Sequence, residues 1–400
     1  MAFISRNRWR SQIGSLGLTA SMLMACGGTS SSTTVATTPS PSASPASAPS
    51  GSGIAAAGSP LGSAPTNPVT FTATGALTVP RTDQTATLLA NGLVLVTGGQ
   101  SAGAPLATAE LFDPAHGTFT ATGTMHTERF LQTATLLSSG KVLIVGGVST
   151  DSVTASAELY DPRTGTFTPT GSMTQARAKH AATLLSDGQV LVTGGGAGSG
   201  PVATAELYDP AKGKFRAIAS MTEPREGQTS TLLPDGRVLV AGGGTPGGPR
   251  ATAELFDPRS GTFRGTGSMA EARGGPTATL LKDGLVLVDG GEGVTDELST
   301  AEIYDPAKGS FTPTREMATA RVGHTATLLS DGRVLIAGGD KDGGLASAEL
   351  YDPATGTFAS GGDMNAARYA HTATLLPNGH VLIAGGSDYR GPLASAELSP

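Results

Sequence analysis

The chain has 400 residues, of which 26 are Lys or Arg and 32 are Asp or Glu, so its formal net charge is −6. An acidic balance is the opposite of the basic face that nucleic-acid binding requires, so we expect no nucleic-acid partner. Cys26 is the only cysteine, which excludes any disulfide within the chain.

The first 25 residues have the composition of an export signal. Arg6, Arg8 and Arg10 form a basic start, and an apolar run of residues 13–25 follows them. A basic region followed by a short apolar region is typical of a secretory signal peptide. The run is too short and too rich in Ser and Gly to span a bilayer comfortably. We therefore predict that residues 1–25 are a signal peptide.

The signal ends in Leu-Met-Ala-Cys at positions 23–26. This stretch resembles the lipobox of bacterial lipoproteins, and an ordinary signal peptide with a chance cysteine is the alternative. The resemblance implies that Cys26 is lipidated, becomes the first residue of the mature chain, and anchors it to a membrane of the cell envelope. Gly27 rather than Asp follows the cysteine, which by the same resemblance favours the outer membrane in a Gram-negative cell.

Residues 27–68 contain no charged residue and consist mostly of Ser, Thr, Ala, Pro and Gly. Such a segment cannot bury enough apolar surface to fold. We therefore predict a lipidated cysteine and disordered tether over residues 26–68, with a span on the order of 35 Å. Removal of residues 1–25 takes away three Arg and no acid, so the mature chain would have 23 basic and 32 acidic residues and a net charge of −9.

The rest of the chain repeats one pattern seven times. The first glycine of a Gly-Gly pair recurs at Gly98, Gly146, Gly194, Gly242, Gly290, Gly338 and Gly385, with a spacing of 48 residues five times and then 47. A period near 50 with four short β-like runs per unit is typical of β-propellers. The Gly-Gly pair after an apolar strand, the Arg before that strand and the Tyr or Phe after it resemble the Kelch family over residues 69–398. We predict an all-β, seven-bladed Kelch-type β-propeller over residues 69–400, with four antiparallel strands per blade.

Residues 321–363 illustrate one unit. Strand a is predicted as HTATLL from His324, strand b as the RVLIA that precedes Gly-Gly, strand c as the ASAELY that ends at Tyr351, and strand d from Phe358. An Asp-Gly pair makes a tight turn between strands a and b. An Asp-Pro-Ala-Thr-Gly segment turns between strands c and d, where Gly can adopt a positive φ.

The two ends of the repeat region complement each other. The last copy stops after strand c, at residues 396–398, and has no strand d of its own. Residues 69–75 precede the first copy and match strand d elsewhere. We predict that this N-terminal strand completes the last blade, which leaves no open edge between the first and last blades.

Arg and Glu each recur once per copy at a fixed position. The arginines are Arg81, Arg129, Arg177, Arg225, Arg273, Arg321 and Arg368, and the glutamates are Glu110, Glu158, Glu206, Glu254, Glu302, Glu349 and Glu397. An active site needs one acid and one base rather than seven of each. We therefore interpret them as one structural ion pair per blade, which could bridge neighbouring blades and for which the planar guanidinium is well suited.

The start of strand a carries polar residues in six copies. His180, His324 and His371 hold this position in three blades, and the others have Gln84, Gln132, Gln228 and Pro276. Blades 6 and 7 are neighbours, but blade 3 lies across the ring, so we do not expect a three-histidine metal site. We predict a polar ring bonded to backbone or water, and neither a metal nor another cofactor.

The seven copies vary mainly in the loops between strands b and c and between strands d and a, which lie on one face of a propeller. Three aromatic residues of this face are not required by the repeat: Phe130, Tyr369 and Tyr389, in blades 2 and 7. Blade 1 lies between these blades and contributes Asp83 and Gln84, and Arg390 and His126 are nearby in sequence. We predict a shallow ligand-binding patch formed by these seven residues. Scattered surface aromatics are the alternative.

Two classes of function fit these features. The first is a monomeric, non-catalytic binding module of the cell envelope, tethered to the membrane and specific for a glycan or a protein. The second is an enzyme, since Kelch-like propellers include galactose-oxidase-like copper enzymes and sialic-acid mutarotases. The resemblance to the oxidases implies a Cys–Tyr cross-link, which the lone Cys26 puts in doubt. A mutarotase-like enzyme needs only acid–base groups, for which Asp83, Glu226, Asp289 and Glu292 are off-pattern candidates.

Overall fold

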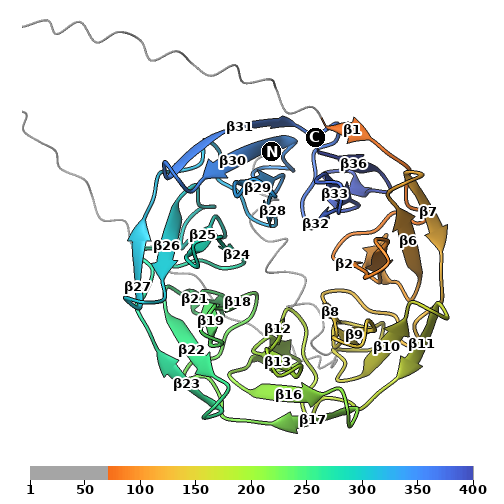
Figure 1. Ribbon diagram of the computed structural model, residues 1–400, viewed down its shortest axis with the longest axis horizontal. Coiled ribbons are helices and arrows are strands. Elements are labelled where there is room, and N and C mark those ends of the chain that lie inside the picture. The colour runs from red at the N-terminus through yellow and green to blue at the C-terminus, as the bar shows by residue number, and fades with distance from the viewer. Residues whose placement is uncertain (1–70, 400) are drawn as a thin grey trace, which may run out of the picture. The chain divides into compact units, whose positions relative to one another are not determined.

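The computed structural model describes residues 71–399, which form a seven-bladed β-propeller (Figure 1). Seven four-stranded antiparallel sheets surround a central axis. Residues 71–399 contain no helix, and therefore no helix long and apolar enough to cross a membrane. The predicted fold class is confirmed.

Each blade contains an inner strand a and successive strands b, c and d toward the rim. The inner strands are β2 (Thr85–Leu88), β8 (Thr133–Leu136), β12 (Ala181–Leu184), β18 (Thr229–Leu232), β24 (Thr277–Leu280), β28 (Thr325–Leu328) and β32 (Thr372–Leu375). The b strands are β3 (Val94–Thr97), β9 (Val142–Val145), β13 (Val190–Thr193), β19 (Val238–Ala241), β25 (Val286–Asp289), β29 (Val334–Ala337) and β33 (Val381–Ala384).

The outer half of each blade follows the same order. The c strands are β6 (Ala109–Asp113), β10 (Ala157–Asp161), β16 (Ala205–Asp209), β22 (Ala253–Asp257), β26 (Ala301–Asp305), β30 (Ser347–Asp352) and β36 (Ala396–Leu398). The d strands are β7 (Thr118–Ala121), β11 (Thr166–Pro169), β17 (Lys214–Ala217), β23 (Thr262–Gly265), β27 (Ser310–Pro313), β31 (Thr357–Asp363) and β1 (Thr72–Ala73).

Four of the loops between strands b and c form short hairpins of their own. Their strands are β4 (Gln100–Ser101) with β5 (Ala104–Pro105), β14 (Gly196–Ala197) with β15 (Gly200–Pro201), β20 (Gly244–Thr245) with β21 (Gly248–Pro249), and β34 (Ser387–Asp388) with β35 (Gly391–Pro392). These hairpins belong to blades 1, 3, 4 and 7, so the loops that vary in sequence also vary in structure.

The hydrophobic core lies in the seams between blades. Every residue of the b strands is buried, because both faces of the strand are covered by neighbouring blades. One seam, for example, packs Val94 and Phe112 of blade 1 against Leu376 and Leu382 of blade 7. A buried strand of this kind appears in sequence as a continuous apolar run rather than an alternating one.

The N-terminal strand closes the ring, as predicted. β1 pairs with β36 in antiparallel register, with Thr72 opposite Leu398. Phe71 is 4% exposed and packs in the seam between blades 6 and 7. The first and last described parts of the chain therefore form one sheet, and the ring has no unpaired seam.

Each repeated arginine forms an ion pair with the glutamate of its own blade. The seven Nη2–Oε1 distances are 2.6–3.2 Å, and every arginine side chain is fully buried. The contact is single rather than bidentate, because Nη1 of Arg81 donates to the carbonyl oxygens of Gly98 and Thr108 at 2.9 and 3.1 Å. The pairs lie within blades and do not bridge neighbours.

The link between blades is made by the backbone of the same arginine. The amide of Gly386 donates to the carbonyl oxygen of Arg81 at 2.9 Å, and the amide of Gly99 donates in the same way to Arg129. Gly98 has a φ of +62°, and a Cβ atom there would lie 2.5 Å from the carbonyl oxygen of Arg129. The repeated Gly-Gly pair is therefore required by close approach to the next blade.

We predict that Arg321→Ala lowers the free energy of unfolding by about 3–5 kcal/mol, because it leaves the buried Glu349 carboxylate without its cation. Arg333→Ala is the matched control, since Arg333 is 47% exposed and pairs with Asp331 on the surface. It should cost less than about 1 kcal/mol. Chemical denaturation measures both values. Unchanged stability of the Arg321 variant would contradict the structural role of the pair.

Candidate functional site

The two faces of the propeller differ in their sequence variation. The turns between strands a and b and between c and d form one face and repeat nearly unchanged, as the seven Asp-Gly or related turns and the Asp-Pro segments show. The loops between b and c and between d and a form the other, which we call the variable face. A site that distinguishes one ligand from another needs non-repeated residues, so we sought it on the variable face.

One residue from each blade forms a ring around the central axis on the variable face. This axial ring consists of Asp83, Leu131, Lys179, Gly227, Gly275, Gly323 and Ala370. The amide of each member donates to the carbonyl oxygen of the preceding member at 2.8–3.2 Å, in six of the seven steps. Among these residues, only the step from Gly275 to Gly323 lacks such a bond.

All seven members of the axial ring have a left-handed backbone conformation. Their φ angles lie between +49° and +64°. Three blades use glycine, which adopts this conformation without strain, whereas Asp83, Leu131, Lys179 and Ala370 carry a Cβ atom. A side chain in this region costs roughly 1 kcal/mol or more per residue. The ring itself therefore does not require the side chains of blades 1–3.

A second circle of residues surrounds the axial ring. The residue before each ring member forms a β-bridge with the loop after Gly-Gly in the same blade. These pairs are Thr82–Gln100, Phe130–Val148, Ala178–Gly196, Glu226–Gly244, Gly274–Glu292, Val322–Asp340 and Tyr369–Ser387. All seven blades share this backbone bridge, but the side chains that it carries differ. The residue before the ring member is aromatic in blades 2 and 7, acidic in blade 4 and small in blades 3 and 5.

Charged groups of blades 1, 4 and 5 act electrostatically on Lys179 of blade 3. Burial lowers the pKa of Lys179, and the negative charges of Glu226, Asp83 and Glu292 oppose that shift. Burial raises the pKa of Asp83, although Nε2 of Gln100 donates to its Oδ2 at 2.9 Å. Burial also raises the pKa of Glu226, against the effect of Lys179. Poorly solvated ionisable groups of both signs close to one another are typical of functional sites.

The seven residues predicted as a ligand patch occupy different places. Asp83 is in the axial ring, and Phe130 and Tyr369 are in the second circle. The Cβ atom of Tyr369 lies 3.7 Å from where a Cβ on Gly323 would be, so this aromatic residue adjoins the ring. Gln84 is buried directly after Asp83, and its Nε2 donates to the carbonyl oxygen of Ala384 at 2.9 Å.

The other three residues lie away from the axial ring. Tyr389 is 65% exposed in the β34–β35 hairpin, where the Arg390 guanidinium stacks on its ring at 4.9 Å. Both the amide and the Nδ1 atom of His126 contact Oε2 of Glu158, at 2.8 and 2.9 Å, which places His126 at the ion pair of blade 2. Among the described residues, no hydrogen bond or ring contact joins these three to Asp83.

Sequence reasoning did not identify Lys179 or Leu131. Both occupy a position where three other copies have glycine, so aligning the seven copies would have singled them out. Glu226 and Glu292 were recognised as departures from the repeat, but nothing in the sequence placed them beside Lys179. The structure does so because the ring brings blades 1, 3, 4 and 5 to a common centre.

The histidines at the start of strand a are buried and bond to side chains across blade seams, whereas backbone or water partners were predicted. Nε2 of His180 lies 2.8 Å from the hydroxyl of Thr133, and burial lowers the pKa of His180 to about 3. Nε2 of His324 lies 2.9 Å from a carboxylate oxygen of the buried Asp289. Each histidine thus contacts a different neighbour, and the three do not converge. Asp289 is held in a seam and not beside Lys179.

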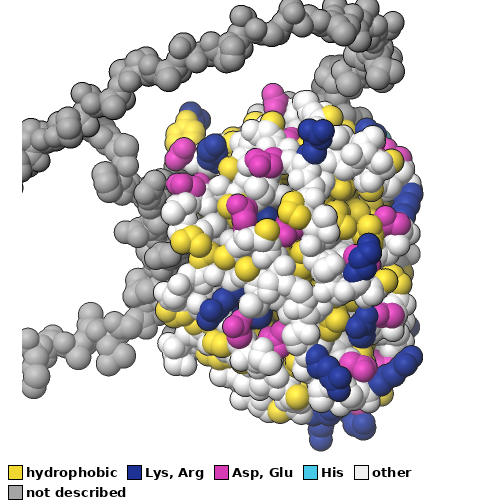
Figure 2. All heavy atoms as spheres, turned by 90° about the vertical axis from the view of Figure 1, so that its left-hand side faces the viewer, with side chains coloured by type: hydrophobic (Ala, Val, Ile, Leu, Met, Phe, Trp, Pro, Cys, Tyr) yellow, Lys and Arg dark blue, Asp and Glu magenta, His cyan; other side chains and the backbone are white. Residues whose placement is uncertain are grey.

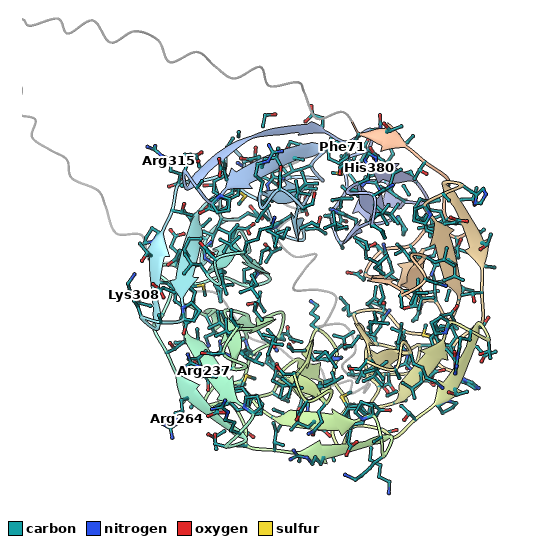
Figure 3. All side chains as sticks on the ribbon, in the orientation of Figure 1. Phe71, Arg237, Arg264, Lys308, Arg315 and His380 are labelled. Atoms are coloured by element: carbon teal, nitrogen blue, oxygen red, sulfur yellow. The ribbon has the colours of Figure 1, made fainter. Side chains whose placement is uncertain are left out.

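The rim carries no single-sign surface on the side drawn in Figure 2, where Lys and Arg are interspersed with Asp and Glu. Lys308, Arg315 and Arg264 point outward from the rim in Figure 3. These cations are separated from the axial ring by the strands of their blades. The side of the rim in view therefore offers no continuous basic face.

Comparison with known proteins supports the repeat and the fold. A family model described as the Kelch motif matches residues 130–174 and 177–222. A solved structure described as a fungal alcohol oxidase of the AA5 family in complex with copper has a TM-score of 0.68 and 19% sequence identity, and covers 83% of this chain and 76% of its own. At this identity the likeness shows the fold alone. No curated protein is significantly similar in sequence.

Residues 71–399 contain no group of three or more His, Cys, Asp or Glu placed to hold a metal ion. The fold is shared by 952 chains of solved structures, so it does not specify a function. The chain carries Kelch motifs on a seven-bladed propeller, a fold that commonly mediates binding.

We predict that Asp83→Asn raises the melting temperature at pH 7. The pKa of Asp83 is raised above 3.8 in the folded protein, so its ionised form destabilises the fold at every pH above that raised value. Below pH 3.8 the carboxyl is protonated in both states, and the two proteins should melt together at about pH 3. Asn retains an acceptor for Gln100 and tolerates the left-handed backbone.

The matched control for this measurement is Asp187→Asn, which makes the same change in an exposed turn of the constant face. It should not reproduce the gain at pH 7. A lower melting temperature of the Asp83 variant at pH 7 would show that the carboxylate stabilises the ring, contrary to our interpretation.

Proposed function

We propose that this Kelch-motif propeller is a membrane-tethered, non-catalytic binding module of the cell envelope, which takes a glycan at the axial ring of the variable face. The observation that carries the proposal is the set of side chains in the ring. Asp83, Leu131 and Lys179 stand in a left-handed backbone where other blades have glycine.

The blades that have glycine in the axial ring show what the fold requires at this position. Gly227, Gly275 and Gly323 form the same ring without a side chain, so the fold does not need one there. A side chain at a left-handed position costs stability, and burying Asp83 and Lys179 costs more. Strained and poorly solvated residues of this kind are typical of ligand sites, where they are retained for what they bind.

The surroundings of the ring favour a carbohydrate. Phe130 and Tyr369 flank it from blades 2 and 7, and an aromatic ring offers a sugar a large contact area at a low cost in entropy. Gln100, Glu226 and Glu292 supply amide and carboxylate groups that can bond sugar hydroxyls. The glycines of blades 4–6 leave the backbone open to close approach. A protein ligand is the alternative outcome of a screen.

We predict that Leu131→Gly and Asp83→Gly weaken glycan binding at least tenfold without lowering the free energy of unfolding by more than about 1 kcal/mol, since glycine suits the backbone at both positions. A glycan array identifies the ligand, and calorimetry measures its affinity for each variant. Ala370→Gly is the matched control, because it makes the same backbone change where the side chain is only a methyl group. If the control weakens binding as much as the other two, the site lies elsewhere.

The membrane tether rests on residues outside the described part of the chain. We propose that Cys26 is lipidated and that residues 27–68 connect it to the propeller, on the basis of the lipobox-like sequence and the absence of charge. Cys26→Ala should move the protein from the membrane fraction, with the outer membrane expected in a Gram-negative cell, to the soluble fraction. A variant that still sediments with membranes would contradict the anchor.

An enzyme that uses acid–base groups is the second candidate. The raised pKa values of Asp83 and Glu226 and the lowered pKa of Lys179 favour it, because such shifts suit proton transfer near neutral pH. A reaction that needs no metal, such as sugar anomer interconversion, fits these groups best. NMR of freshly dissolved sugar separates the candidates, since a binding module leaves the rate of interconversion unchanged.

A further inference from the structure

We infer that the glycan taken at the axial ring is an oligosaccharide chain, which extends outward between the loops of blades 6 and 7 and places a further sugar on Tyr389. This inference rests on the proposed function and specifies the length and path of its ligand. It follows from the positions of Tyr369 and Tyr389 on blade 7, and from the glycine that blade 6 has beside each of them.

The two tyrosines follow one another outward from the axial ring. Tyr369 directly precedes the ring member Ala370, and its backbone exchanges two hydrogen bonds, of 3.0 and 2.9 Å, with Ser387 of β34. Tyr389 comes two residues after Ser387, at the tip of the β34–β35 hairpin. Two residues of strand span about 7 Å and paired strands lie about 5 Å apart, which places the Cα atoms of the tyrosines roughly 8–9 Å apart. This separation suits two linked sugars better than one.

Blade 6 has a glycine beside each tyrosine. The Cβ atom of Tyr369 lies 3.7 Å from where a Cβ on Gly323 would be, and the Cβ atom of Tyr389 lies 3.9 Å from the same position on Gly343. Gly343 has a φ of +131°, a conformation that side chains rarely allow. A sugar that stacks on either tyrosine can therefore approach the backbone of blade 6 without meeting a side chain at these two glycines.

The loop that contains Gly343 is the shortest of its kind. It reads Asp-Lys-Asp-Gly-Gly-Leu-Ala-Ser after Gly-Gly, one residue fewer than in every other blade. Oδ1 of Asp340 accepts the amides of Gly343 and Gly344 at 2.9 and 3.0 Å, which holds the loop in a compact turn. A short loop without a hairpin of its own in the described chain leaves the side of Tyr389 toward blade 6 uncovered.

The tip of the blade 7 hairpin differs from its three counterparts. The two tip residues are Ala-Gly in blade 1, Gly-Ser in blade 3 and Pro-Gly in blade 4, and most of these residue types are common in tight turns. Blade 7 has Tyr389 and Arg390 instead, so the turn itself requires neither side chain. Tyr389 is also one of two exposed large hydrophobic residues in the range 71–399. An aromatic side chain added to a working turn is available to a ligand.

Arg390 holds the ring of Tyr389 in place. Its Nε atom donates to the hydroxyl of Tyr389 at 2.7 Å, and its guanidinium lies over the ring at 4.9 Å from the centroid. The tyrosine is nevertheless 65% exposed, so the other face of the ring is open. A fixed aromatic face offers a sugar a large contact area at a low cost in entropy. The remaining N–H groups of Arg390 can donate to sugar hydroxyls.

A protein that binds the hairpin tip alone is the main rival, because Tyr and Arg are also common at protein interfaces. The two ligands predict different effects of removing Tyr389. If one chain covers both tyrosines, Tyr389 contributes to the binding of long oligomers and not to that of a monosaccharide at the axial ring. A separate protein-binding tip would leave the binding of glycans of every length unchanged.

The test uses the full-length protein and a glycan array that carries the common hexoses and N-acetylhexosamines, each as the monosaccharide and as β-1,4-linked oligomers up to the hexamer. Calorimetry then measures the affinity for each member of the series that binds. We expect the affinity to rise roughly tenfold from monosaccharide to hexamer, the effect of about one well-packed aromatic contact. Tyr389→Ala should remove this rise, with the affinity for the monosaccharide and the melting temperature unchanged.

Two further variants control the measurement. Tyr389→Phe should keep the rise, because it retains the aromatic ring. Val294→Ala removes the other exposed apolar side chain of the variable face, which is 78% exposed on the blade 5 loop, and should leave every affinity unchanged. A loss in this variant equal to that of Tyr389→Ala would reduce the effect to general apolar surface and overturn the inference.

The remaining outcomes separate the inference from the proposed function. Equal affinity for monosaccharide and hexamer, or a full rise in Tyr389→Ala, would overturn the inference and leave glycan binding at the axial ring intact. If neither the monosaccharides nor the oligomers of the array bound the protein, the proposed function would fail with the inference.

Discussion

The buried arginine of each blade is the interaction on which the rest of the propeller depends. A guanidinium group without solvent is stable only if its donors are satisfied, and Arg81 places them on the carboxylate of Glu110 and on two carbonyl oxygens. The second oxygen of Glu110 accepts the amide of Thr78, which holds the loop before strand a. The carbonyl of Arg81 then accepts the amide of Gly386 from the preceding blade. One buried charge thus positions a strand, a loop and a seam.

Glu158 of the scaffold and Glu226 of the variable face have pKa values shifted in opposite directions. Burial would raise the pKa of Glu158, but hydrogen bonds from His126 and Thr127 and the charge of Arg129 lower it below the usual value. The pKa of Glu226 is raised, because burial is opposed only by the charge of Lys179. A carboxylate that stabilises the fold has its donors in place, whereas Glu226 lacks one. The two acids therefore differ in their surroundings, although both are glutamates.

Because the unit is repeated seven times, equivalent positions of different blades can be compared within one protein. Each blade contributes one residue to the axial ring, and in three blades this residue is glycine, which shows that the ring needs no side chain there. Departures in blades 1–5 therefore stand out as additions to a working scaffold. Glycines of blades 4–6 leave one side of the ring without side chains, whereas Asp83, Leu131 and Lys179 carry them on the other side, so a nearly symmetric fold has an asymmetric variable face.

The amino-acid sequence by itself determined the architecture. Seven Gly-Gly pairs, seven Arg and seven Glu at fixed spacing, together with a strand d before the first copy, predicted the blade count and the closing of the last blade by residues 69–75. These features are local and repeated, so one unit read correctly predicts all seven. The sequence also marked the variable face, and Asp83, Phe130 and Tyr369 on it.

Only the tertiary structure decided which residues share a site. Lys179, Glu226 and Glu292 are far apart along the chain, and they meet because inter-blade hydrogen bonds carry blades 3, 4 and 5 around one axis. His126 and Gln84 looked equally suitable in sequence, yet the structure bonds them to Glu158 and Ala384. The left-handed backbone of Leu131 and Lys179 likewise cannot be read from either residue, since it is imposed by the ring. Side-chain surroundings are long-range properties of a closed ring, and spacing along one chain does not contain them.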